Sequence, residues 1–118
     1  MSEQPLNPEI TVQAFAELRA RATADSTLVA PVLLDVREPW EVATAQIPGS
    51  LLMPVGEVRS RAYTELDPDV HIVVVCAHGQ RSLSVAMWLR REGFEQAQSL
   101  AGGIEAWLRI ISPDGSLR

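Results

Sequence analysis

The feature that most constrains this chain is the run Val70-His71-Ile72-Val73-Val74-Val75, which leads directly into the only cysteine, Cys76. All of its residues except the histidine are apolar and β-branched, and polar and apolar positions do not alternate. A strand of this kind is buried on both faces, as the central strand of a parallel sheet is. The sequence therefore predicts a covered parallel sheet, with Cys76 at the carboxyl end of a central strand.

Short apolar runs alternate with amphipathic stretches along the rest of the chain. Further strands are predicted at residues 32–36, 50–53 and 97–100, and Ile10 forms a short strand or a capping contact. Helices are predicted at residues 8–24, with Thr11 as N-cap, and at 39–45, 57–63, 82–92 and 104–110. This alternation predicts an α/β fold with a mostly parallel central sheet of about five strands and helices on both faces.

Composition narrows the class of protein. The 118 residues suit one domain, 1–118, with a core of about 10–110 and flexible ends. A net charge of -5 argues against nucleic-acid binding, which needs a basic surface. No apolar stretch is long enough to cross a bilayer, and the first residues do not resemble a signal peptide, so no membrane association and a cytoplasmic location are expected.

Cys76 is the strongest candidate for chemistry. Ligands of parallel sheets bind beyond the carboxyl ends of the strands, where Cys76 lies before the loop Ala77-His78-Gly79-Gln80 and a helix opened by Arg81 and Ser82. The loop amides and the helix dipole would stabilise a thiolate. The alternative is an ordinary buried cysteine. A single cysteine forms no disulfide within the chain and no cysteine-based metal site.

Several neighbouring side chains have two interpretations each. Arg81 either faces an anion or pins the loop. His78 attracts anionic donors when protonated, or is simply solvated. Ser82 is interpreted as the N-cap of the helix. Asp35 and Arg37 follow a neighbouring strand, where they either pair with each other or brace the Cys76 loop.

Four segments, in this order and at these spacings, resemble the rhodanese family over nearly the whole chain, from Ile10 to Trp107. They are Asp35-Val36-Arg37-Glu38-Pro39-Trp40-Glu41, Ile47-Pro48-Gly49-Ser50 with Met53-Pro54, Cys76-Ala77-His78-Gly79-Gln80-Arg81-Ser82, and Gly102-Gly103-Ile104-Glu105-Ala106-Trp107.

The resemblance implies a sulfurtransferase. Cys76 would take sulfane sulfur from a donor such as thiosulfate or a persulfide, carry it as a cysteine persulfide, and pass it to cyanide, a thiol or a sulfur-carrier protein. The loop amides of Ala77, His78, Gly79, Gln80 and Arg81 would hold the persulfide. Neither a cofactor nor a metal is implied. Four residues separate Cys76 from Arg81, as in resembling sulfurtransferases, whereas the related phosphatases have five.

One segment departs from the family pattern, because Ala45-Gln46 stand where many members have Gly-His. This departure bears on donor preference, since the segment is expected to shape the entrance. Two further functions remain open at this point. One is a non-catalytic or sulfur-relay module of the same fold that docks a partner protein, and the other is a phosphatase or arsenate reductase.

Overall fold

The computed structural model describes residues 6–114. Its centre is a five-stranded sheet in the order β1-β5-β4-β2-β3, in which every neighbouring pair is parallel. The strands are β1 (Glu9–Ile10), β2 (Val32–Asp35), β3 (Leu51–Leu52), β4 (Ile72–Val75) and β5 (Ala97–Leu100). The predicted parallel sheet with β4 at its centre is confirmed. Of the ends expected to be flexible on either side of a core of about 10–110, residues 1–5 and 115–118 lie outside the described residues.

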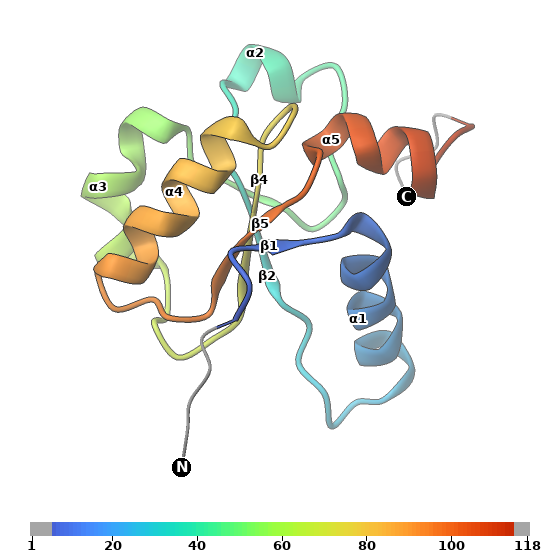
Figure 1. Cartoon of the computed structure of the whole chain (residues 1–118), viewed down its shortest axis with the longest axis horizontal. Coiled ribbons are helices and arrows are strands. Elements are labelled where there is room, and N and C mark those ends of the chain that lie inside the picture. The colour runs from blue at the N-terminus through green and yellow to red at the C-terminus, as the bar shows by residue number, and fades with distance from the viewer. Residues whose placement is uncertain (1–5, 115–118) are drawn as a thin grey trace.

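Helices cover both faces of the sheet (Figure 1). On one face lie α3 (Val55–Glu65) and α4 (Gln80–Arg91), and on the other lie α1 (Val12–Ala24) and α5 (Gly103–Ala106), which continues into the π-helical turn η1 (Trp107–Ile111). The short helix α2 (Pro39–Val42) lies beyond the carboxyl ends of the strands. Within residues 6–114 no helix is long and apolar enough to cross a membrane.

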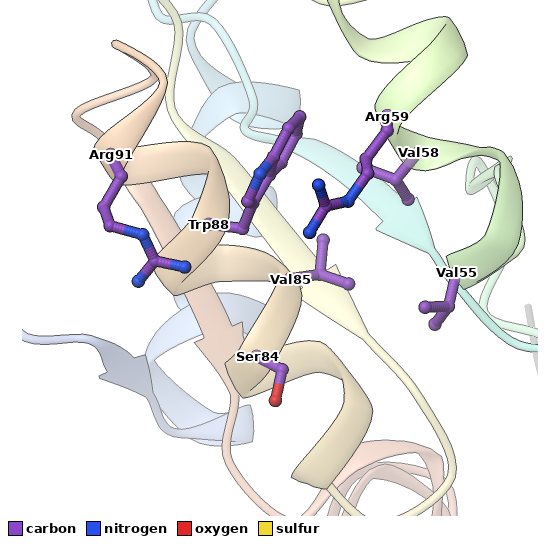
Figure 2. A pocket seen from close by; sticks show the side chains of 7 residues that line it. All are labelled: Val55, Val58, Arg59, Ser84, Val85, Trp88 and Arg91. Atoms are coloured by element: carbon purple, nitrogen blue, oxygen red, sulfur yellow. The ribbon is translucent and has the colours of Figure 1, made fainter.

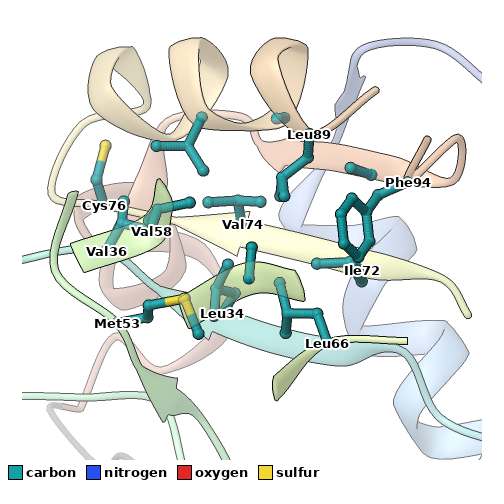
Figure 3. Packing of buried hydrophobic residues seen from close by; sticks show 14 residues of the cluster. Leu34, Val36, Met53, Val58, Leu66, Ile72, Val74, Cys76, Leu89 and Phe94 are labelled. Atoms are coloured by element: carbon teal, nitrogen blue, oxygen red, sulfur yellow. The ribbon is translucent and has the colours of Figure 1, made fainter. Parts of the chain in front are cut away.

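Two apolar cores explain the sequence of β4. Ile72 and Val74 face the core beneath α3 and α4, whereas Val73 and Val75 face the core beneath α1 and α5. All four are fully buried, and each contributes roughly 1.5–3 kcal/mol by leaving water. Figure 3 shows the first core, with Cys76 at its edge and its sulfur directed towards the start of α4.

The register of the strands places two predicted site segments side by side. β2 and β4 pair so that Asp35 lies opposite Val75, the residue before Cys76. The carboxyl ends of both strands therefore reach the same edge of the sheet. The loops that follow them, with Arg37 on one and Cys76 on the other, start as neighbours.

Helix boundaries differ from the prediction in ways that have local causes. α4 begins at Gln80 and not at Ser82, because Gly79 adopts a φ of 104° and caps the helix early. α2 is shorter than predicted, since the Arg37 guanidinium binds the carbonyl of Ala45 and holds the chain there outside the helix. α3 is longer than predicted, and the last helix changes to π-helical hydrogen bonding at Trp107.

Candidate active site

The sulfur of Cys76 lies at the amino-terminal end of α4, which has twelve residues. Its Sγ accepts hydrogen bonds from the backbone N–H groups of Gly79, at 3.1 Å, and Ser82, at 3.3 Å. The residue is fully buried. The first turn of α4 and the loop before it therefore direct N–H dipoles at one sulfur atom, which is the arrangement that stabilises a negative charge there.

The pKa of the Cys76 thiol reflects two opposing effects. Burial raises this pKa, because a thiolate is poorly solvated inside the protein. Hydrogen bonds from the Ser82 hydroxyl and from the N–H groups of Ser82, Gly79 and His78 lower it. The hydrogen bonds outweigh burial, so the net pKa lies below the ordinary value of a thiol. A larger fraction of Cys76 is therefore present as the nucleophilic thiolate near neutral pH.

Ser82 does not have the predicted role of helix N-cap. Gly79 occupies the cap, and Ser82 is a fully buried residue of the first turn. Its hydroxyl lies 3.4 Å from Cys76 Sγ and 2.7 Å from Ser99 Oγ, and Ser99 in turn lies 3.5 Å from the carbonyl of Gly79. When Cys76 is a thiol, it donates to the Ser82 hydroxyl, which donates to Ser99, and Ser99 donates to the carbonyl of Gly79. When Cys76 is a thiolate, the direction reverses, so that Ser99 donates to Ser82 and Ser82 donates to the sulfur. Both protonation states are therefore satisfied.

The back of the loop is held by α5. The N–H of Ile104 donates to the carbonyl of Cys76 at 2.9 Å, and the N–H of Glu105 donates to the carbonyl of Ala77 at 3.1 Å. Gly103 permits this approach, since a Cβ there would lie 2.3 Å from the Cys76 carbonyl oxygen. Because these carbonyls are bound from behind, the loop turns its N–H groups towards the sulfur.

Arg81 pins the loop to α2. Its Nη1 and Nη2 donate to the two carboxylate oxygens of Glu41 at 2.8 and 2.9 Å. The Glu41 carboxylate, and to a smaller extent the Cys76 sulfur, raise the pKa of Arg81. Of the two expected contacts of Arg81, the structure shows the one that ties down the loop, through Glu41.

Asp35 and Arg37 form a buried ion pair. Arg37 Nη2 lies 2.9 Å from Asp35 Oδ2, and Arg37 Nε donates to both oxygens of the same carboxylate. Arg37 also donates to the carbonyls of Glu41 and Ala45, at 3.4 and 2.7 Å. The pair therefore fixes the segment after α2, where Ala45-Gln46 depart from the family pattern. It is also linked to the Cys76 loop, because Arg37 binds the backbone of Glu41 and the side chain of Glu41 binds Arg81.

The other loop residues lie at the surface to different degrees. His78 and Gln80 are exposed, Ala77 is half-buried, and Gly79 is buried beneath them. His78 is thus placed where it meets solvent and incoming molecules. Among residues 6–114 no group of three or more His, Cys, Asp or Glu side chains is arranged to hold a metal ion.

Comparison with known proteins identifies the family. The model of the rhodanese-like domain matches residues 14–110. The chain belongs to the rhodanese-like domain family. A putative sulfurtransferase of Bacillus subtilis is 35% identical over 99 residues, which cover 84% of this chain and 91% of that protein. The rhodanese fold is also that of a human single-domain sulfurtransferase, with a TM-score of 0.73, 27% identity, and coverage of 89% and 98% of the two chains.

Other relatives are longer proteins. The chain spans 50% of a putative sulfur carrier protein of Bacillus subtilis, with 35% identity over 100 residues, which cover 85% of this chain. It spans 28% of a rhodanese-like and PpiC domain-containing chloroplast protein of Arabidopsis thaliana, with 36% identity over 84 residues, or 69% of this chain. The rhodanese-like domain thus occurs both as most of a protein and as one part of a larger one.

A groove of about 240 Å³ separates α3 from α4 on the outside of this rhodanese-like fold (Figure 2). The Trp88 ring lines this groove. Arg59 lies over the ring, with its Cζ 5.5 Å from the ring centroid. Arg91 lines the same groove, and within the described part of the chain neither arginine forms an ion pair. The lining residues are Val55, Val58, Arg59, Ser84, Val85, Trp88 and Arg91.

Three contributors to the site were missed from sequence. Glu41 lies within a recognised segment, but its pairing with Arg81, 40 positions away, depends on the path of the loop between them. Ser99 gave no clear signal, because its strand also contains Gln98, and the full burial of Ser99 and its contact with Ser82 are known only from the structure. Gly103 gave a weak signal, since a Gly-Gly pair indicates a close backbone approach without naming its partner.

Proposed function

We propose that this protein is a sulfurtransferase that carries sulfur as a persulfide on Cys76. The observation that carries the proposal is the convergence of the Gly79 and Ser82 N–H groups on Cys76 Sγ, together with the lowered pKa of that thiol. Relatives named as sulfurtransferases support the same reaction class. With thiosulfate as donor, the Cys76 thiolate attacks the outer sulfur, the S–S bond of thiosulfate breaks, and sulfite leaves with the bonding electron pair.

The second half of the reaction returns the thiolate. A nucleophilic acceptor such as cyanide or a thiolate attacks the terminal sulfur of the Cys76 persulfide, and the cysteine sulfur leaves as a thiolate. The N–H groups of Gly79 and Ser82 stabilise the negative charge of the leaving sulfur. Because both half-reactions begin or end at a thiolate, the same hydrogen bonds assist each of them.

Steady-state kinetics with thiosulfate and cyanide test this proposal. Cys76→Ser removes the nucleophile while leaving a side chain of similar size, so thiocyanate formation should fall to the uncatalysed rate. The unfolding midpoint of this variant should stay near that of the wild type, which would show that the fold is intact. Substantial thiocyanate production by a folded Cys76→Ser variant would rule out the proposed nucleophile.

The groove between α3 and α4 supports a second candidate function, delivery of sulfur to an acidic protein acceptor. Arg59 and Arg91 lack ion-pair partners within residues 6–114, although the whole chain has a net charge of -5. The groove begins beside Ser84, in the second turn of the helix that starts at the Cys76 loop. An acidic segment bound in the groove would lie along the same helix as the sulfur.

Two cysteine-containing peptides, one rich in glutamate and one uncharged, test this docking function as sulfur acceptors. The acidic peptide should accept sulfur with a lower KM, and Arg59→Glu with Arg91→Glu should remove that advantage. Arg21→Glu on α1 is the control for Arg59→Glu and Arg91→Glu when each is made singly, because it makes the same charge change as either one on the opposite face. Equal KM values for both peptides in the wild type would exclude the groove as an acidic docking site.

A further inference from the structure

The Glu41 carboxylate is held in a fixed position against the active-site arginine. Its two oxygens each accept one hydrogen bond from Arg81, and Oε2 accepts a third from the backbone N–H of Glu38 at 2.9 Å. The backbone of Glu41 is fixed as well, because its carbonyl accepts from Arg37. The Glu41 side chain is only 14% exposed, whereas that of Arg81 is 39% exposed.

This arrangement determines the charge near the sulfur. The hydrogen bonds from Arg81 outweigh burial and lower the pKa of Glu41 to about 2, so the carboxylate is ionised throughout the neutral range. One negative charge therefore compensates the one positive charge that Arg81 brings to the loop. A donor that approaches Cys76 meets a compensated ion pair and not a free cation.

We propose that Glu41 is a specificity residue that sets the donor preference of the site by charge. By compensating Arg81, the carboxylate disfavours dianionic donors such as thiosulfate relative to donors with one negative charge or none. This inference rests on the proposed sulfur transfer through Cys76. Organic persulfides and thiosulfonates are the donor classes that the ion pair favours, because they lose less through repulsion by Glu41.

Thiosulfate and methanethiosulfonate form a suitable pair of donors. Each transfers its terminal sulfur to the thiolate, and the leaving group is sulfite from the first and methanesulfinate from the second. In both half-reactions the S–S bond of the donor breaks and the leaving group takes the bonding electron pair. The difference is in charge, because thiosulfate carries two negative charges and methanethiosulfonate carries one. Coulomb energy is proportional to charge. Removing the charge of Glu41 should therefore change the activation free energy, as measured by kcat/KM, twice as much with thiosulfate as with methanethiosulfonate.

The test is the donor kcat/KM of Glu41→Gln, which removes the negative charge and keeps a hydrogen-bond acceptor for Arg81. We expect an increase of about 3-fold with methanethiosulfonate and about 10-fold with thiosulfate, the second being roughly the square of the first. The increase should become smaller as salt is added, because ions screen the charge. Glu41→Ala removes the same charge and should change the ratio of the two donors in the same direction.

Three further variants separate charge from structure. Glu41→Asp keeps the charge. Its ratio of kcat/KM for thiosulfate to kcat/KM for methanethiosulfonate should therefore stay within about 2-fold of the wild-type ratio, even if its kcat falls. Arg81→Ala leaves Glu41 uncompensated and should reduce thiosulfate kcat/KM more than methanethiosulfonate kcat/KM. Glu17→Gln makes the same change of net charge on α1, far from the loop in the fold (Figure 1), and should leave the ratio unchanged.

The inference would be overturned if the ratio of the kcat/KM values for the two donors were unchanged in both Glu41→Gln and Glu41→Ala. It would also be overturned if these variants lost kcat/KM equally with both donors. Either result would mean that Glu41 only holds the loop in place. Failure of the proposed function looks different, because the wild-type protein would then transfer sulfur from neither donor.

Discussion

At the scale of single residues, the site depends on how Cys76 is solvated by the protein. Its sulfur is buried, which alone would favour the neutral thiol, yet it receives bonds from Gly79 and Ser82. The identity of the residue does not distinguish a reactive cysteine from an inert one. The difference lies in the N–H groups that surround it, and these come from the backbone path between β4 and α4.

Ser82→Ala should raise the pKa of Cys76, because it removes the hydroxyl that donates to the thiolate and keeps the backbone N–H. The thiolate absorbance in the ultraviolet, titrated against pH, measures this directly because the chain has one cysteine. Reaction of Cys76 with thiosulfate near pH 7 should slow by roughly tenfold, the effect of one hydrogen bond to a charged group.

Ser84→Ala is the control for this titration, since Ser84 lies on the same helix but is exposed. Its titration midpoint should match that of the wild type. If the Ser82→Ala midpoint also matched, the buried hydroxyl would have no part in stabilising the thiolate.

At the scale of elements, the Cys76 loop is held between α4 in front and α5 behind. The contact with α5 requires Gly103, which has a φ of 62° and no room for a Cβ. Gly103→Ala should destabilise the fold by about 2–5 kcal/mol, the combined cost of a left-handed alanine and an overpacked contact. It should also raise the pKa of Cys76, because the displaced loop no longer directs its N–H groups at the sulfur.

Gly56→Ala in α3 is the matched substitution. Its new Cβ meets nothing within 4 Å, and the position is helical, so this variant should be as stable as the wild type or more stable by about 0.5–1 kcal/mol. Urea unfolding of both variants checks the comparison. Equal effects at Gly103 and Gly56 would show that α5 does not pack closely against the loop.

At the scale of the whole molecule, the ion pair between Glu41 and Arg81 links α2 to α4 and contributes to acid stability. The pKa of Glu41 falls from 4.5 to about 2 on folding. A carboxylate with a lowered folded-state pKa stabilises the fold above its unfolded pKa, and this contribution is lost as the pH falls through the folded value. Stability from Glu41 should therefore decline between pH 4.5 and about 2.

Urea unfolding midpoints measured at about pH 6 and about pH 3 test this linkage. The midpoint of the wild type should fall more between these values than that of Glu41→Gln, which has no carboxylate to protonate. Parallel decreases in the two proteins would mean that the ion pair does not contribute to the acid sensitivity of the fold.

The sequence predicted the architecture because its strongest signals are local. The apolar run before Cys76 identifies the central strand, and the alternation of elements identifies an α/β fold. The start of α4 was misplaced by two residues, since hydrophobic spacing does not show that Gly79 adopts a left-handed conformation. The partner of Arg81 was missed for a related reason, because Glu41 reaches it only through tertiary folding.

The mass of the intact protein tests the central claim most directly. After incubation with thiosulfate and removal of the excess, the wild-type protein should gain the mass of one sulfur atom, and a thiol or cyanide should remove it again. Cys76→Ser should gain nothing under the same conditions. An unchanged mass in the wild type, or the same gain in Cys76→Ser, would contradict a persulfide on Cys76 and with it the proposed function.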